Sequence, residues 1–349
     1  MSVVNRRTRA GANTGPARWW LVAGRLVLLG SAAASAVAWA LGVTVLQPLS
    51  EPTGPDAFAE DNTYWARELR WGALIALLLV LILLARGGRW TTWGVLVSGC
   101  AWLAVDVGLD RIDYNSDSTK LGIGAAAAAL ICCAVVMVVP AVPRPNALLA
   151  VAMVAAVASG MATATESPTD VEPALNTGSA AVGSLLALVA VAAAVQTAGP
   201  VDRPGVRTTV AVGILALATP WLLRHVWPQP SGARLLVTFA FAVLLVVVVV
   251  ALAKTRPGPR QDRYSYGVVA AIAVVALPMM LWPLALLALV VQIGRPFTEL
   301  AANTPIHSAD ADAVMIVLTI PMGLILARTL RNFVFDQPAS APGRDLRRG

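Results

Sequence analysis

Long apolar stretches separated by short polar segments run along the whole chain. Each stretch approaches or exceeds the roughly 20 residues that a helix needs to cross a bilayer. The pattern predicts ten membrane-spanning helices, at residues 19–46, 69–86, 90–109, 120–140, 146–165, 178–197, 208–226, 234–253, 264–292 and 312–330. The predicted fold class is therefore an all-α polytopic membrane bundle, with one transmembrane domain at 19–330 and polar tails at 1–18 and 331–349. The first stretch is too long for the core of a signal peptide, so we expect it to be retained.

The composition excludes a water-soluble protein. Of 349 residues, 58% are hydrophobic and 13% are charged, whereas a soluble domain carries about 25% charged residues. The net charge of +7 is explained by basic residues that gather in alternate segments. Since no basic face is interleaved with aromatic residues, nucleic-acid binding is not predicted, and the expected surroundings are the lipid bilayer.

Basic residues alternate between rich and poor segments. The rich segments hold Arg6, Arg7, Arg9 and Arg18; Arg86 and Arg89; Arg144; Arg203 and Arg207; Lys254, Arg256, Arg260 and Arg263; and Arg328, Arg331, Arg344, Arg347 and Arg348. The poor segments hold Arg67, Arg70, Arg111, Lys120, Arg224, Arg234 and Arg295. Because cytoplasmic loops carry the excess of Lys and Arg, both tails are predicted to be cytoplasmic. A composition rich in Ala, Val and Arg is typical of GC-rich bacteria, which predicts a bacterial cytoplasmic membrane.

Asp106 is the one acidic residue in the interior of a predicted span, since Asp312 stands at the first position of the last one. Carboxylates within a membrane are costly and are by default candidates for function. Asp106, Asp110 and Asp113 follow one another at i, i+4 and i+7, which places them on one face of a helix. Such a stripe could bind a cation or relay a proton along a transport pathway. The alternative is that the helix ends near Asp106 and that these carboxylates are solvated.

The loop that follows has Asp113, Asn115 and Asp117 at the spacing that begins an EF-hand calcium loop. The match ends there, because Ser118 stands where glycine is expected and Gly124 stands where the bidentate glutamate should be. A polar turn is therefore the preferred interpretation. No other motif for a metal or nucleotide occurs, so neither a cofactor nor a metal site is predicted.

Prolines gather in the late apolar stretches. Pro278 and Pro283 lie in the middle of 264–292, where each removes a backbone hydrogen bond and tends to kink or break a helix. Broken helices near the bilayer midplane form binding sites in many transporters, so both prolines are candidates for a transport pathway. A purely structural kink is the alternative.

Other segments suggest partners or chemistry. The chain lacks the Gly-x-x-x-x-Gly-Lys-Ser/Thr motif, so an ATP-driven activity would require an ATPase partner subunit. The basic loop from Lys254 to Arg263 is a candidate contact for anionic lipid. Glu60 and Asp61 lie in the first predicted outer loop, where multi-span glycosyltransferases that use lipid-linked sugars place a catalytic acid. No motif in this loop matches theirs, so the likeness is one of architecture alone.

Three classes of function are compatible with these features. The preferred hypothesis is a transporter or permease-type component, based on the number of spans, the late prolines and the Asp106 stripe. The second is a non-catalytic membrane anchor or assembly partner, which the sparse site chemistry favours. The third and least favoured is a membrane enzyme that acts on a lipid-linked or extracytoplasmic substrate through Glu60, Asp61 or the acids between Asp110 and Asp117.

Overall fold

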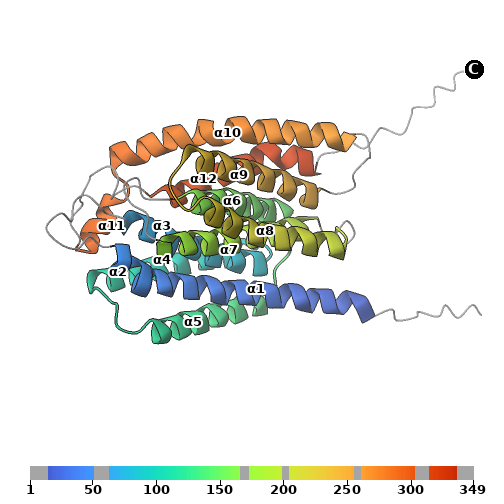
Figure 1. The fold of residues 1–349 in the computed structure, drawn as a ribbon. Coiled ribbons are helices and arrows are strands. Elements are labelled where there is room, and N and C mark those ends of the chain that lie inside the picture. The colour runs from blue at the N-terminus through green and yellow to red at the C-terminus, as the bar shows by residue number, and fades with distance from the viewer. Residues whose placement is uncertain are drawn as a thin grey trace, which may run out of the picture.

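The structure is a computed structural model that describes residues 15–50, 63–165, 173–198, 204–254, 261–302 and 314–335. Within these ranges every regular element is a helix, which confirms the predicted all-α class (Figure 1). The elements are α1 (Gly15–Leu41), the π-helical segment η1 (Gly42–Leu46), α2 (Gln47–Ser50), α3 (Thr63–Leu84), α4 (Arg89–Arg111), α5 (Ser118–Val138), α6 (Pro145–Ala164), α7 (Pro173–Thr197), α8 (Val206–Val226), α9 (Gly232–Ala253), α10 (Gln261–Val291), α11 (Arg295–Leu300) and α12 (Met315–Phe335).

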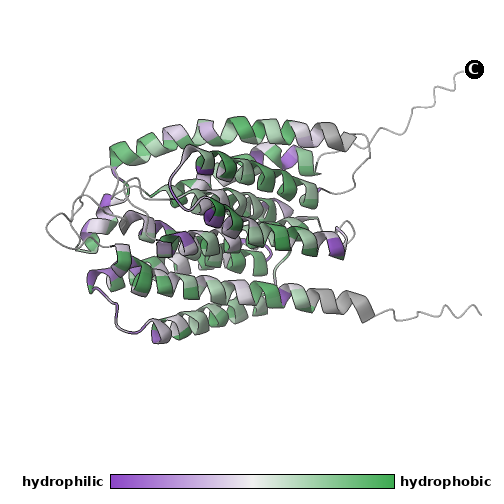
Figure 2. Cartoon of the chain, in the orientation of Figure 1, coloured by the Kyte–Doolittle hydropathy of each residue, from purple (hydrophilic) through white to green (hydrophobic). Residues whose placement is uncertain are grey.

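Helix length and apolar composition identify this bundle as a multi-pass membrane protein. In the described part of the chain, 9 helical stretches are long and apolar enough to cross a membrane, and α1, η1 and α2 together form the first of them. Helix α3 has a comparable length of 22 residues, but it carries Arg67, Glu68 and Arg70 in its first two turns. Counted together, α3 and the other stretches form the ten-helix bundle that the sequence predicts. Apolar residues dominate almost every helix of this bundle (Figure 2).

The two ends of the bundle differ in charge. Helix α1 begins and α12 ends at the same end (Figure 1), where the Arg144 N–H donates a hydrogen bond of 3.0 Å to the Arg86 carbonyl oxygen. The exposed arginines at this end, which we call the arginine end, are Arg86, Arg89, Arg144, Arg207, Arg328 and Arg331. At the opposite end, four of the predicted outer basic residues are buried instead, namely Arg67, Arg70, Arg224 and Arg234.

Small residues allow the central helices to approach closely. Helices α6 and α7 lie in the middle of the bundle and have the largest buried share of the described spans. A Cβ atom at Gly160 of α6 would lie 2.5 Å from the Cβ atom of Ala242 on α9. A Cβ atom at Gly323 of α12 would overlap the backbone of Val154 on α6. Because lipid tails are as apolar as the helix surfaces, such close contact is what stabilises helix pairs in membranes.

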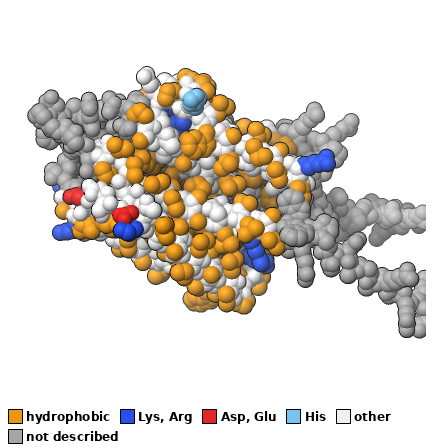
Figure 3. Space-filling view, turned by 60° about the horizontal axis from the view of Figure 1, so that its bottom comes forward, with side chains coloured by type: hydrophobic (Ala, Val, Ile, Leu, Met, Phe, Trp, Pro, Cys, Tyr) orange, Lys and Arg blue, Asp and Glu red, His pale blue; other side chains and the backbone are white. Residues whose placement is uncertain are grey.

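The peripheral helices expose most of their side chains. In α4 only Val95 and Asp106 are buried, and α8 and α10 are similarly exposed. Figure 3 shows one face of the molecule, on which hydrophobic side chains predominate and charged side chains are few. This is the surface expected of helices that contact the lipid bilayer.

Several predicted boundaries are wrong. Helix α3 begins at Thr63 rather than at residue 69, α7 begins at Pro173 rather than at 178, and α11 is not predicted at all. Helix α10 is continuous from Gln261 to Val291 and contains Pro278 and Pro283, in agreement with the single span predicted at 264–292. Each proline removes one backbone hydrogen bond and its ring clashes with the preceding turn. The apolar segments before Pro278 and after Pro283 are long enough to keep this helix continuous.

Candidate functional site

The beginning of α3 carries a group of buried charged and tryptophan side chains. We call Trp65, Arg67, Glu68, Arg70 and Trp71 the α3 hub. All five are at most 7% exposed. Charged residues and tryptophans occupy most positions of this segment, so their side chains leave the helix in several directions. As a result, the hub contacts a different helix through nearly every side chain.

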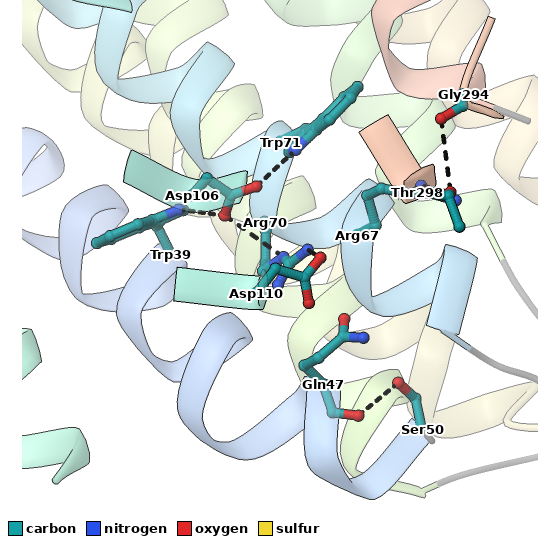
Figure 4. Close-up of polar contacts among 10 residues, drawn as sticks. All are labelled: Trp39, Gln47, Ser50, Arg67, Arg70, Trp71, Asp106, Asp110, Gly294 and Thr298. Carbon is teal, nitrogen blue, oxygen red and sulfur yellow. Dashed lines mark hydrogen bonds and ion pairs between the residues drawn. The ribbon is translucent and has the colours of Figure 1, made fainter. Parts of the chain in front are cut away.

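Asp106 of α4 is enclosed at the centre of these contacts (Figure 4). Its Oδ1 accepts a hydrogen bond of 2.8 Å from Trp39 Nε1, and its Oδ2 accepts one of 2.9 Å from Trp71 Nε1. The Nε atom of Arg70 lies 3.5 Å from Asp106 Oδ1, and both side chains are 1% exposed. Two indole donors and one guanidinium therefore replace the water that a membrane-buried carboxylate loses.

Arg70 also binds a second carboxylate of the same helix. Its Nη2 atom lies 3.1 Å from Asp110 Oδ2, and Asp110 is one helical turn after Asp106, so both acids face α3. The interpretation that α4 ends near Asp106 with solvated carboxylates is wrong, because α4 continues to Arg111 and Asp106 is buried. Asp110 is partly accessible, with 12% of its side chain exposed.

Asp113 does not continue the stripe as a helical residue. It follows the end of α4 with a φ of 47°, and the N–H of Tyr114 closes the helix on the carbonyl oxygen of Leu109 at 3.1 Å. This left-handed turn is a common way to end a helix, and aspartate tolerates it better than most residues. The turn places Asp113 near Asp110 at the edge of the hub, and not one further helical turn along α4.

A small cavity connects the hub to this turn. Its volume of about 20 Å³ is enough for one water molecule. It is lined by Val43, Gln47, Pro48, Arg70, Leu109, Asp110, Asp113, Tyr114 and Asn115. The cavity lies between the buried guanidinium of Arg70 and loop residues that are exposed at the opposite end of the bundle.

The π-helical segment η1 provides space for Arg70. A Cβ atom at Gly42 would lie 2.5 Å from Arg70 Cγ, so only glycine permits this approach of α1 to α3. A π-helical turn contains one more residue than an α-helical turn, and such turns are often found at functional sites. Here it brings Val43 and Gln47 to the wall of the small cavity.

The hub also positions α11 and α12. Arg67 Nη1 donates a hydrogen bond of 2.5 Å to Thr298 Oγ1 on α11, and Trp71 packs edge-on against Phe297 with ring centres 4.9 Å apart. The carboxylate of Glu68 accepts hydrogen bonds from the N–H groups of Met315 and Ile316, the latter at 2.6 Å. Glu68 therefore caps the beginning of α12, whose first N–H groups have no partner within the helix.

On its other side the hub contacts α7 and α8. Trp65 Nε1 donates a hydrogen bond of 3.0 Å to Ser179 Oγ. The guanidinium of Arg224 lies over the Trp65 ring at 5.4 Å from the ring centre. Arg224 also donates hydrogen bonds to Asn176 Oδ1 at 3.1 Å and to the Thr165 carbonyl oxygen. The attraction between a cation and an aromatic face is stronger where water is excluded, and both Arg224 and Trp65 are buried here.

The sequence-predicted candidates are only partly brought together. Asp106 and Asp110 share Arg70, and Asp113 lies at the cavity beside them. Pro278 and Pro283 contribute to neither the hub nor the cavity, and Pro283 is exposed on the surface of α10.

Four further candidates are not part of the described site. Glu60 and Asp61 lie outside the described residues. Lys254 is buried at the end of α9, with its Nζ atom 5.5 Å from the ring centre of Tyr266, so its ammonium group does not face lipid in this structure. Asp117 is the N-cap of α5, and its Oδ1 accepts a hydrogen bond of 2.9 Å from the Lys120 N–H. Its role in the structure is therefore that of a helix cap.

Comparisons with protein-family models, with well-characterised proteins and with solved structures give no match to this chain. Functional arguments therefore depend on the geometry of the hub itself. The chemistry that it offers is ionic: one guanidinium holds two carboxylates that belong to a helix with little other buried surface.

Proposed function

We propose that this protein is a transporter or permease-type component of a bacterial cytoplasmic membrane, and that Arg70, Asp106 and Asp110 form its ion-coupling site. The observation that carries the proposal is the position of Arg70 between a sealed and a partly accessible carboxylate. Ionisable groups inside a membrane bundle are costly to keep and commonly mark ion pathways. A proton or a cation that reaches Asp110 would compete with Arg70 for this carboxylate.

This competition would change how firmly α4 is attached to the rest of the bundle. Helix α4 buries only Val95 and Asp106 fully, so the ionic contacts to Arg70 and the indole hydrogen bonds to Asp106 are a large part of its attachment, beside the packing of Trp102 against Trp39. Neutralising Asp110 removes one of these contacts and shifts the balance between an attached and a displaced α4. A ligand that binds the two states differently changes their populations, which is what coupling requires.

The proposal is tested by complementation in the native host. Deletion of the gene is expected to change the distribution of at least one solute across the membrane, and the wild-type chain is expected to restore it. Asp110→Asn and Asp106→Asn should restore about one tenth or less of that transport at equal protein levels, as loss of a charged contact would predict. Glu299→Gln, at an exposed carboxylate paired with Arg295 at 2.7 Å, is the matched control. Full restoration by Asp110→Asn would overturn the ion-coupling site.

The exposed apolar surface of α4, α8 and α10 supports a second candidate, a membrane assembly partner. Native mass spectrometry of the gently extracted protein distinguishes the two. An ATPase that co-purifies makes the chain a permease subunit, whereas a different stable partner and no transport defect favour an assembly role. An enzyme acting on a lipid-linked substrate through Glu60 and Asp61 has no support from the described side chains.

A further inference from the structure

Two connections between helices meet at the arginine end of the bundle. One joins α3 to α4 at residues 85–88, and the other joins α5 to α6 at residues 139–144. The Arg144 N–H donates a hydrogen bond of 3.0 Å to the Arg86 carbonyl oxygen, and a Cβ atom at Gly87 would lie 3.5 Å from Arg144 Cβ. Two arginines that are distant in sequence are therefore neighbours, and both side chains are exposed.

The backbone at Arg86 has a conformation that suits glycine better than arginine. Its φ is 52° and that of Gly87 is 70°, so the chain takes a left-handed turn directly after α3. The Gly87 N–H donates a hydrogen bond of 3.0 Å to the Ile82 carbonyl oxygen, which closes the helix. Because a side chain at such a position costs free energy relative to glycine, the Arg86 guanidinium can be removed by a glycine substitution that the backbone favours.

These arginines have no counter-ion among the described side chains. The acidic side chains that the structure describes all lie toward the opposite end, namely Glu68, Asp106, Asp110, Asp113, Asp117 and Glu299. On the face shown in Figure 3, only basic side chains are seen near the arginine end. Arg89, the first residue of α4, adds a third exposed guanidinium, and α4 and α6 both begin here with their positive ends toward the arginines. We call Arg86, Arg89 and Arg144 the junction patch.

Exposed apolar side chains lie next to the junction patch. Trp90 follows Arg89 directly and is 82% exposed, and Trp93 lies about one turn farther along α4. Val142, two residues before Arg144, is 81% exposed. The Arg89 guanidinium lies over the Trp90 ring at 6.0 Å from the ring centre. Tryptophan beside arginine at the end of a span is typical of the level where lipid headgroups meet acyl chains, so the anion within reach of the patch is a lipid phosphate.

We propose that the junction patch binds the phosphate of a phospholipid with net negative charge, in the leaflet at the arginine end. Arg86 and Arg144 donate hydrogen bonds to the phosphate oxygens, for which the planar guanidinium is well suited. Arg89 adds positive charge, and Trp90 packs against the acyl chains. A zwitterionic lipid also carries an ammonium, which the three guanidiniums repel, so the patch selects by net charge. The site shares no residue with the hub and does not depend on the transport role proposed for it.

Two substitutions in the patch and one matched control outside it test the proposal. Arg86→Gly and Arg144→Gln each remove a guanidinium from the patch, whereas Arg207→Gln removes an exposed arginine from the first turn of α8 at the same end. The full-length chain is delipidated in mild detergent and titrated with palmitoyl-oleoyl phosphatidylglycerol or phosphatidylethanolamine, and bound lipid is counted by native mass spectrometry. We expect one tightly bound phosphatidylglycerol, about fivefold weaker binding for each patch variant, and no change for Arg207→Gln.

Thermal unfolding separates lipid binding from folding. In lipid-free detergent, Arg86→Gly should unfold at the same temperature as the wild type or at a higher one, because glycine suits the left-handed turn. Added phosphatidylglycerol should raise the unfolding midpoint of this variant less than that of the wild type, since a ligand stabilises according to its affinity. An equal rise in both proteins would contradict a phosphate contact at Arg86.

Three further results would overturn the proposal. Equal weakening by Arg207→Gln would show a general attraction between a basic protein end and anionic lipid, without a site. Equal affinity of the wild type for the two lipids would exclude selection by net charge. Binding of inorganic phosphate as tight as that of phosphatidylglycerol, measured by competition, would assign the patch to a soluble anion.

Discussion

A carboxylate inside a membrane bundle is costly to bury unless hydrogen bonds and a counter-charge replace its hydration. Asp106 has both, because two tryptophan N–H groups and the guanidinium of Arg70 surround it. The same arrangement makes Arg70 dependent on Asp106, since a buried cation without its partner is also costly. At the scale of single residues, the hub is therefore stable as a set and unstable when one member is removed.

Replacing Asp106 by Asn should destabilise the protein more than replacing both charged partners. Loss of one member of a buried ion pair costs about 3–5 kcal/mol, because the other charge stays behind. The double substitution Asp106→Leu with Arg70→Met removes both charges and is expected to lose less than either single charge removal. Unfolding by denaturant in detergent, followed by tryptophan fluorescence, measures these differences.

An exposed ion pair at the same end of the bundle provides the control. Arg295 and Glu299 are 51% and 55% exposed, and exposed pairs contribute about 0–1 kcal/mol. Glu299→Gln should therefore leave the unfolding midpoint nearly unchanged. If Asp106→Asn were equally harmless, the contacts around Asp106 would contribute little to stability.

Gly42 is expected to be the least replaceable glycine of the first span. Ala at this position places a Cβ atom 2.5 Å from Arg70 Cγ, and relieving this overlap should cost about 1–3 kcal/mol. Gly30→Ala on α1 meets no atom within 4 Å and should be neutral or stabilising, since alanine favours helices. Thermal unfolding of the two variants side by side tests this, and equal midpoints would contradict it.

At the scale of elements, Glu68 connects the beginning of α12 to α3. Glu68→Ala leaves the N–H groups of Met315 and Ile316 without their acceptor, which is equivalent to loss of a helix cap at about 0.5–2 kcal/mol. Hydrogen exchange at these two amides should accelerate by about tenfold. Amides near Leu326, in the middle of the same helix, serve as the internal reference and should exchange as before. A uniform change along α12 would instead indicate global destabilisation.

The beginning of α3 marks the limit of prediction for single elements. Apolar length predicted this span at 69–86, but the charges near its beginning placed the predicted boundary six residues late. Arg67 and Glu68 therefore fell in the preceding loop, and Arg70 was counted among the outer basic residues. Their partners are on helices that are distant in sequence, such as Asp106 on α4 and Met315 on α12. A single sequence does not reveal which spans are neighbours, so it could not show that these charges are neutralised within the bundle.

The signal that was present is the close spacing of tryptophan and charge between Trp65 and Trp71 in an otherwise apolar chain. Asp106, by contrast, could be selected from sequence because it lies within the predicted span 90–109, although the sequence left open whether the helix ended near it. The prolines of α10 were selected by a local rule about hydrogen bonding, and the helix continues through both. The selection of Asp106 needed only one residue and its apolar surroundings, whereas the roles of Arg67, Glu68 and Arg70 depend on partners in other helices.

At the scale of the whole molecule, the arginine end carries the larger group of exposed arginines. At the opposite end Arg111 and Arg295 are exposed, whereas four others are buried, namely Arg67, Arg70, Arg224 and Arg234. This asymmetry predicts that the arginine end faces the cytoplasm. Single cysteines at Val142 of the arginine end and at Ser116 of the opposite end, in a chain whose own Cys100, Cys132 and Cys133 are replaced, allow a direct test. Ser116→Cys should react with a membrane-impermeant maleimide on intact cells, and Val142→Cys only after permeabilisation. The reverse pattern would invert the topology.

The charged beginning of α3 has a consequence for how the chain is made. Arginine or aspartate costs about 2.5–3.5 kcal/mol to insert at the centre of an isolated helix and less near its ends. An isolated α3 would bring Arg67, Glu68 and Arg70 into the bilayer before their partners exist. Because α4 is synthesised directly after it and supplies Asp106 and Asp110, we expect the two helices to leave the translocon as a pair. Ribosome-stalled chains that end before α4 should therefore leave α3 incompletely inserted.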